Sequence, residues 1–172
     1  IYMAMGGIPF YLNELKKAKS AVQLIDEICF TEQGLLYSEY DYLFASLFKN
    51  PDNHSVLVET LASHPQGLTR TELIKLSKIS EGGTINRVLE ELENSGFIIR
   101  QLPFKKKRKD SIYRLSDMYC LFFLKFIRPN KPSVKGTWLT LFNSSSYKAW
   151  SGYAFENICT IHIEQIKKAL GI

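Results

Sequence analysis

Hydrophobic and polar positions between residues 67 and 117 repeat with two different periods. Apolar residues recur every three or four positions in TINRVLEELENSG, which predicts an amphipathic helix that ends before Gly96. Thr69 stands three residues before Glu72, the spacing of a capping box at the start of an earlier helix. FIIRQLPF and SIYRLS are short β-rich runs on either side of the basic segment KKKRKD. The order strand, helix, helix, strand, basic turn, strand predicts a winged helix-turn-helix.

The apolar faces of these elements define the expected core of the winged helix, which we place at residues 51–117. A helix that opens the region, SVLVETLASHP, should turn three residues inward, namely Val56, Leu57 and Leu61. In the amphipathic helix that ends the helix-turn-helix, Leu89 and Leu92 should face the core. We expect an antiparallel hairpin between Phe97–Leu102 and Ser111–Leu115, whose buried face carries Phe97, Ile99 and Ile112.

Residues 1–50 show the spacing of a small helical bundle. GGIPFYLNELKKA places Pro9 in the first turn of a helix, where proline is favoured, and the inner face should carry Phe10, Leu12 and Leu15. SAVQLIDEICF follows a serine N-cap, Ser20. SEYDYLFASLFKNPD should begin after Ser38 and end before Pro51, with four residues buried: Tyr42, Leu43, Leu47 and Phe48.

Residues 118–172 are also predicted to be helical. DMYCLFFLKFIRPNKP is an apolar helix that should end at Pro129. WSGYAFENICTIHIEQIKKALGI is predicted to be one amphipathic helix, with an apolar face made by Phe155, Ile158, Cys159, Ile163 and Ile166. We expect this helix to be the first element of a further domain. The fold class predicted for the chain is mainly α with a small β-hairpin.

The positive charge of the chain is concentrated in the predicted hairpin turn. The chain has 172 residues and a formal net charge of +5, and the run Lys105–Lys109 by itself contributes five cations. The remainder is neutral overall, which favours a local docking site over a generally basic surface. Hydrophobic residues make up 45% of the chain, which suffices for a buried core. The aromatic residues (11 Phe, 9 Tyr and 2 Trp) argue against a disordered protein.

The cysteines and the apolar runs bear on where the protein resides. Cys29, Cys120 and Cys159 are widely spaced and form no CxxC motif. Their odd number favours reduced thiols over a disulfide framework, so we expect a cytoplasmic protein. The most apolar run, Tyr119–Leu124, is too short to span a bilayer, and no membrane association is expected.

Three motifs occur in an order that resembles one protein family. They are GGIPFYL (6–12), YRLSDMYCLFFLKFIRPN (113–130) and WSGYAFENIC (150–159). In this combination the chain resembles the archaeal-type AAA+/STAND ATPases. The resemblance implies a helical lid at 1–50, a winged helix at 51–117, and at 118–172 a connecting helix and the start of a domain similar to restriction endonucleases. It also implies an ATPase domain that uses ATP and Mg, which would be a partner within the same chain, together with the rest of the nuclease-like domain.

The resemblance assigns roles to three residues. Gly7 and Pro9 fit the GxP element that lids of this family place against the nucleotide, although a proline at a helix start needs no such role. Glu156 matches the acidic residue that nuclease-like folds of this kind often carry on their first helix. The motif GxxxxGK[ST] does not occur, so these residues alone should neither hydrolyse ATP nor bind it tightly.

The hairpin turn, or wing, shows the strongest sign of nucleic-acid binding. Its five consecutive cations suit contacts with DNA phosphates that are independent of sequence: Lys105, Lys106, Lys107, Arg108 and Lys109. At the start of the helix that would enter a major groove, three residues could reach base edges: Thr84, Asn86 and Arg87. The same helix region carries four carboxylates that would repel phosphate: Glu81, Glu90, Glu91 and Glu93.

Two classes of function are therefore open. The basic wing favours a DNA-binding module coupled to an ATPase. The acidic helix favours a regulatory, protein-interaction module that relays the nucleotide state without binding DNA. Cys159 and His162 lie one helical turn apart, but a structural zinc site needs four ligands, so we expect no metal there.

Overall fold

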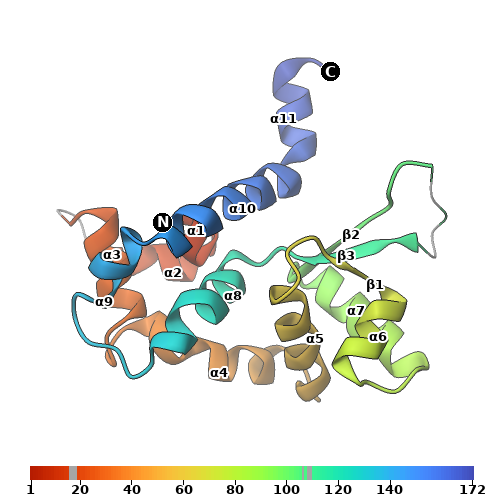
Figure 1. Ribbon diagram of the computed structural model, residues 1–172, viewed down its shortest axis with the longest axis horizontal. Helices are drawn as coiled ribbons and strands as arrows, with labels where there is room; N and C mark the ends of the chain where they lie inside the picture. The colour runs from red at the N-terminus through yellow and green to blue at the C-terminus, as the bar shows by residue number, and fades with distance from the viewer. Residues whose placement is uncertain (16–18, 106, 108–109) are drawn as a thin grey trace. The chain divides into compact units, whose positions relative to one another are not determined.

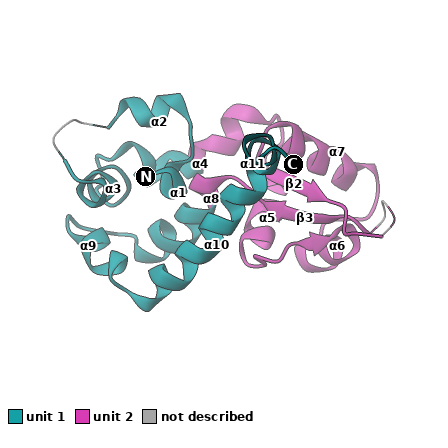
Figure 2. Ribbon diagram, turned by 90° about the horizontal axis from the view of Figure 1, so that it is seen from above, with its two compact units in different colours: residues 1–40, 121–172 teal, residues 41–120 magenta. Residues whose placement is uncertain are grey.

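The computed structural model describes residues 1–15, 19–105, 107 and 110–172 (Figure 1). It is mainly helical with a small three-stranded antiparallel sheet, which confirms the predicted fold class. The chain divides into two compact units (Figure 2). Unit 1 comprises residues 1–40 and 121–172, and unit 2 comprises residues 41–120. Most of the first expected part, residues 1–40, and most of the last, residues 121–172, thus form one unit, while residues 41–50 and 118–120 belong to unit 2 with the winged-helix region.

Unit 2 has the topology of a winged helix-turn-helix. Its elements, after the end of α4 (Leu35–Leu47), are α5 (Asp52–Ala62), β1 (Leu68–Thr69), α6 (Arg70–Ser77), α7 (Gly83–Asn94), β2 (Ile98–Gln101), β3 (Ile112–Leu115) and the start of α8 (Met118–Phe122). The strand order is β1-β3-β2, with both pairs antiparallel. The strands β2 and β3 form the hairpin that bears the wing.

Local sequence features explain where the helices of unit 2 begin and end. The Thr69 hydroxyl accepts the Glu72 backbone N–H at 3.3 Å, and the Glu72 carboxylate accepts the Thr69 N–H at 2.8 Å, so the predicted capping box is confirmed. Gly96 follows the end of α7 with a φ of 77°, a left-handed conformation that glycine adopts without strain. On α7 the buried residues include the predicted Leu89 and Leu92, with Ile85 and Val88 beside them.

Within the hairpin strands, the buried residues are shifted by one position from the predicted ones. Phe97 is buried, but Ile98 and Tyr113 are buried where Ile99 and Ile112 were expected, and the latter two are half-buried. Phe97 precedes β2 and packs its ring 5.2 Å from that of Phe44. Because side chains alternate along a strand and Phe97 lies before β2, counting the alternation from Phe97 placed Ile99 and Ile112 on the buried face, where the structure has Ile98 and Tyr113.

Unit 1 is an all-helical assembly of two chain segments. Its elements are α1 (Tyr2–Met5), α2 (Pro9–Asn13), α3 (Ala21–Cys29), the start of α4, the end of α8, a π-helical turn η2 (Phe123–Ile127), a 3-10 turn η3 (Arg128–Asn130), α9 (Thr137–Phe142), α10 (Ser145–Ile161) and α11 (Ile163–Leu170). The Ser20 N-cap and the helix start at Pro9 agree with the sequence predictions.

An aromatic cluster fills the core of unit 1. The Trp138 ring stacks on Phe30 with ring centroids 5.5 Å apart, and it packs against Phe122 in a T-shaped arrangement with centroids 4.9 Å apart. Asp26 is buried, and its two carboxylate oxygens accept the backbone N–H groups of Gly136 at 2.7 Å and Trp138 at 2.8 Å. These bonds satisfy donors at the start of α9 and fix it against α3, although the two helices are more than a hundred residues apart.

Several predicted faces in the N-terminal segment are wrong. Phe10 and Leu12 are exposed, and Tyr11 between them is buried. Helix α4 begins at Leu35, so Ser38 lies inside the helix and not before its start. The helix extends toward Gly34 because the Leu36 side chain is buried. Gly34 is necessary there, since a Cβ at this position would overlap the Ile28 carbonyl oxygen.

Two further predicted core residues of α4 face solvent, and one residue of α5 does too. Tyr42 and Leu47 are exposed while Phe44 is buried, and Val56 is exposed while its neighbours Leu57 and Val58 are buried. In each case the helix was predicted but its rotation was not. The sequence of a helix with apolar residues on several sides does not specify which side meets a neighbour.

The predicted single C-terminal helix is interrupted at His162, which ends α10 and precedes α11. The residues buried along α10 are Trp150, Ala154 and Asn157, whereas Phe155 and Ile163 of the predicted apolar face are exposed. The Ala154 side chain is small, so α10 can pack closely at this position. The side of α10 that carries Trp150, Ala154 and Asn157 is therefore buried although it has few apolar residues.

Candidate nucleic-acid interface

The wing presents cations to solvent beyond the paired part of the hairpin. Strand pairing reaches Gln101 opposite Ile112, and Lys105 and Lys107 beyond it are exposed. The Lys107 N–H donates to the Asp110 carboxylate at 3.1 Å, and the Asp110 N–H donates to the Lys107 carbonyl at 2.8 Å. The other predicted wing cations, Lys106, Arg108 and Lys109, lie outside the described residues.

The predicted base-reading residues lie on the exposed side of α7. Thr84, Asn86 and Arg87 are all exposed in its first two turns. The Arg70 side chain donates through Nε to Asn86 Oδ1 at 2.8 Å, which links the first residue of α6 to α7. Sequence reasoning missed Arg70, although a cation directly after the Thr69 N-cap could have indicated a place beside the other helix of the motif.

Most of the carboxylates predicted to repel DNA have a positively charged neighbour. Arg70 Nη1 lies 3.5 Å from Glu81 Oε1, and Arg100 Nε lies 3.5 Å from Glu93 Oε1. Arg87 Nε lies 3.9 Å from Glu91 Oε1, while Glu90 is exposed. Such surface pairs contribute little to stability, but they cancel much of the local negative potential. The α7 surface should therefore repel phosphate less strongly than its sequence indicated.

Glu91 is also tied to the core of unit 2 through His54. The ring of His54 is buried, with Nε2 2.7 Å from Glu91 Oε2 and Nδ1 3.2 Å from the Asn50 carbonyl oxygen. It stacks on Phe48 with ring centroids 3.9 Å apart. The contact between His54 and Glu91 fixes the rotation of α7 about its axis relative to α5.

The residues assigned to nucleotide contact lie in the turn between α1 and α2. Pro9 is the first residue of α2 and is exposed, as is Gly7. A Cβ on Gly7 would lie 3.1 Å from the ring of Tyr2, so the glycine also permits this local packing. Neither residue lines the cavity described next. The helix-start role of Pro9 accounts for its position.

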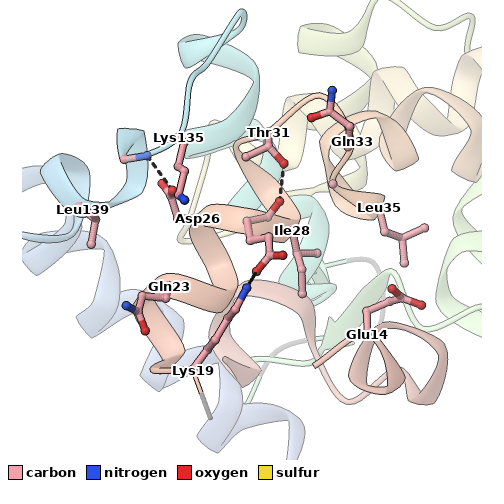
Figure 3. Close-up of a pocket in the computed structure, with 13 residues that line it drawn as sticks. Glu14, Lys19, Gln23, Asp26, Ile28, Thr31, Gln33, Leu35, Lys135 and Leu139 are labelled. Atoms are coloured by element: carbon pink, nitrogen blue, oxygen red, sulfur yellow. Dashed lines mark hydrogen bonds and ion pairs between the residues drawn. The ribbon is translucent and has the colours of Figure 1, made fainter. Parts of the chain in front are cut away.

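A cavity of about 740 Å³ opens between α3, the start of α4 and the segment before α9 in unit 1 (Figure 3). Its lining mixes both signs of charge, with Glu14, Glu27, Lys19 and Lys135 among its residues. Lys19 forms an ion pair with Glu27, and the lining carboxylate of Asp26 is already bonded to α9. This arrangement lacks the concentration of positive charge that a triphosphate requires.

No metal site is formed in the described ranges. Among these residues no group of three or more His, Cys, Asp or Glu side chains lies close enough together to hold an ion. Glu156 is exposed on α10, and His162 Nε2 lies 2.9 Å from the Tyr2 hydroxyl. Cys29, Cys120 and Cys159 form no disulfide, and burial raises the pKa of the Cys29 thiol far above its ordinary range, which disfavours the thiolate form.

In the part of the chain that the structure describes, every helix is too short or too polar to cross a bilayer.

Comparison of the chain with protein-family models, with curated proteins and with solved structures returned no match.

Proposed function

We propose that unit 2 binds DNA, with its wing on the phosphate backbone. The observation that carries this proposal is the position of Lys105 and Lys107, exposed beyond the paired strands of a winged helix-turn-helix. Flexible cations at a hairpin tip can follow a phosphate backbone without reading sequence. The pairing of Glu81, Glu91 and Glu93 with cations supports the proposal, because it weakens the repulsion between α7 and a duplex.

We further propose that this module belongs to a cytoplasmic AAA+/STAND-type ATP-binding protein. The three sequence motifs support the family, and three cysteines that form no disulfide support a reducing compartment. Gly7 and Pro9 would supply at most one wall of a nucleotide site, since the sequence contains no GxxxxGK[ST] motif that could hold the phosphates. ATP and Mg would be held elsewhere in the protein, and the DNA contact proposed here does not depend on them.

Fluorescence anisotropy with a labelled duplex tests the DNA proposal. The decisive variant replaces all five wing cations, 105 to 109, by glutamine. We expect it to bind far more weakly, about equally so for unrelated sequences. The slope of the logarithm of affinity against the logarithm of salt concentration should flatten by about 0.9 for each phosphate that the wing no longer neutralises. Arg87→Ala should weaken binding less, because Arg87 Nε already lies 3.9 Å from Glu91.

A matched control removes five exposed lysines from unit 1 instead. The variant replaces the following residues by glutamine: Lys125, Lys135, Lys148, Lys167 and Lys168. It changes the net charge by the same amount as the wing variant, so a decrease in affinity due to net charge alone would occur in both. Equal decreases in the two variants would contradict a local site on the wing.

The second candidate function is protein interaction without DNA. It is favoured by the engagement of Arg70 and Arg87 with groups of the protein itself. Absence of any duplex affinity for the unmutated chain near 50 mM salt, where phosphate contacts are strong, would overturn the DNA proposal and leave this one. The basic wing would then bind an acidic protein surface.

A further inference from the structure

One wing residue has no role in the phosphate contacts proposed above. Phe104 is 88% exposed, the highest value for any large hydrophobic residue in the described part of the chain. Single exposed apolar side chains are common on protein surfaces. This one differs because Leu102, also exposed, precedes it and the basic run follows it directly.

The backbone around Phe104 holds the ring away from the sheet. Strand pairing stops at Gln101, and Pro103 has no N–H with which to continue it. Lys105 adopts a φ of 59°, a left-handed conformation that is uncommon for a residue other than glycine. The chain therefore turns sharply just after Phe104.

A positively charged side chain lies close to the Phe104 ring. Lys105 Nζ lies 5.2 Å from the centroid of the Phe104 ring, and Lys107 is exposed two residues further on. The described part of the wing thus presents one aromatic face and two exposed lysines. A ligand that fits both must carry a negatively charged backbone and a flat π surface side by side.

We propose that Phe104 stacks on an unpaired DNA base, so that the wing prefers a junction between duplex and single strand to an uninterrupted duplex. In a continuous duplex the base faces are covered by their neighbours, and only the phosphates are available to the wing. At a junction, the first unpaired base exposes a face on which an aromatic ring can stack, while the lysines contact adjacent phosphates. The inference rests on the proposed DNA binding and specifies the form of DNA that the wing selects.

Binding to two matched DNA molecules tests the inference. One is a flush duplex, and the other is the same duplex extended by two unpaired arms, with the fluorescent base 2-aminopurine at the first unpaired position. We expect the unmutated chain to bind the forked DNA on the order of tenfold more tightly than the flush duplex. The 2-aminopurine emission should be quenched on binding, because the base stacks on the ring.

Phe104→Ala should remove the preference and the quenching while leaving affinity for the flush duplex within about twofold, since the lysines remain. Phe104→Tyr should keep both properties. Tyr42→Ala is the control, because it removes another exposed aromatic residue of unit 2 that is not part of the wing. It should behave like the unmutated chain.

The outcomes separate the two proposals. If the unmutated chain binds flush and forked DNA equally, or if Phe104→Ala weakens both equally, the stacking inference is overturned and DNA binding stands. If the unmutated chain binds neither DNA near 50 mM salt, both proposals fail. In that case the aromatic and basic wing would fit an acidic protein partner.

Discussion

The two units of this chain build their cores in different ways. Unit 2 uses one continuous stretch, residues 41–120, and its helices start and stop at local features such as Thr69 and Gly96. Unit 1 joins residues 1–40 to residues 121–172, and its core depends on bonds between these distant segments, of which those of Asp26 are the clearest. A pattern of residues close together in the sequence can therefore specify the elements of unit 2, but it cannot specify the contacts between the two segments of unit 1. Four predictions test this contrast, in order of decreasing effect.

Trp138→Ala should have the largest effect. Trp138 is 1% exposed and packs between Phe30 and Phe122, so its removal should lower the free energy of unfolding of unit 1 by about 3–5 kcal/mol. Trp150 is the other tryptophan of the chain and also lies in unit 1, so its fluorescence during urea denaturation reports on this unit. Leu139→Ala, on the exposed side of α9, should change stability by less than about 0.5 kcal/mol.

The contrast predicts that Trp138→Ala leaves the winged helix folded. Hydrogen exchange of the α7 backbone amides measures this directly. Loss of protection in α7 to the same extent as in α3 would mean that the two units unfold together. The continuous core of unit 2 and the two-segment core of unit 1 would then not unfold separately.

Leu92→Ala is the corresponding change in unit 2. Leu92 is fully buried on α7, so its truncation should cost about 2–5 kcal/mol. Glu90→Ala, at an exposed position of the same helix, should stay within roughly 0.5 kcal/mol. Exchange of the α7 amides under mild denaturant gives both values. Similar costs for the two variants would show that α7 is rotated from the position described here.

Asp26→Asn tests the bonds that join the two segments of unit 1. An asparagine oxygen can accept only one of the two backbone N–H groups at 2.7 and 2.8 Å, and its NH₂ would oppose the other. We expect a loss of about 1–3 kcal/mol, measured by tryptophan fluorescence in urea. Glu27→Gln, next to it on α3, breaks an exposed ion pair and should cost less than about 1 kcal/mol. A cost no greater than that of Glu27→Gln would contradict the role given to Asp26.

Asp117 should give the smallest effect, visible as a pH dependence of unit 2. Burial raises the pKa of its carboxyl group above the ordinary value of 3.8, although the group accepts the Cys120 N–H at 2.7 Å. The folded state therefore keeps the proton at pH values where the unfolded chain has lost it. The contribution of Asp117 to stability should decrease as the pH rises above 3.8.

Asp117→Asn retains an acceptor for the Cys120 N–H and cannot ionise. It should reduce the decrease in the free energy of unfolding between pH 3.8 and neutrality, measured from exchange of the β3 and α8 amides. An unchanged pH profile would show that Asp117 titrates alike in the folded and unfolded chains.

Sequence patterns predicted the fold class, most helices and the hairpin, because caps and turns act within a few residues. Faces were predicted correctly where one clear apolar stripe existed, as at Leu89 and Leu92. They were wrong at Phe10 and Phe155, which lie in helices of unit 1 with apolar residues on more than one side. In such helices the burial of one side is decided by a partner elsewhere in the chain.

The candidate interface shows the same limit. The exposed positions of Lys105, Lys107 and Arg87 follow from hairpin and helix periodicity. The ion pairs that offset the acidic residues of α7 could not be predicted, because Arg100 lies on a strand and Arg70 on another helix. Their distances to Glu93 and Glu81 depend on packing between elements, to which local patterns do not extend.

The insertion of unit 2 within unit 1 also sets an order for folding during synthesis. All residues of the winged helix have been made once position 120 is complete, whereas unit 1 still lacks its second segment. At ribosomal rates residues 121–172 take roughly 3–10 s to add. During that interval Phe30, which is fully buried in the finished protein, has neither Trp138 nor Phe122 to cover it. We therefore expect nascent unit 1 to bind chaperones that recognise short apolar segments more readily than the winged helix does.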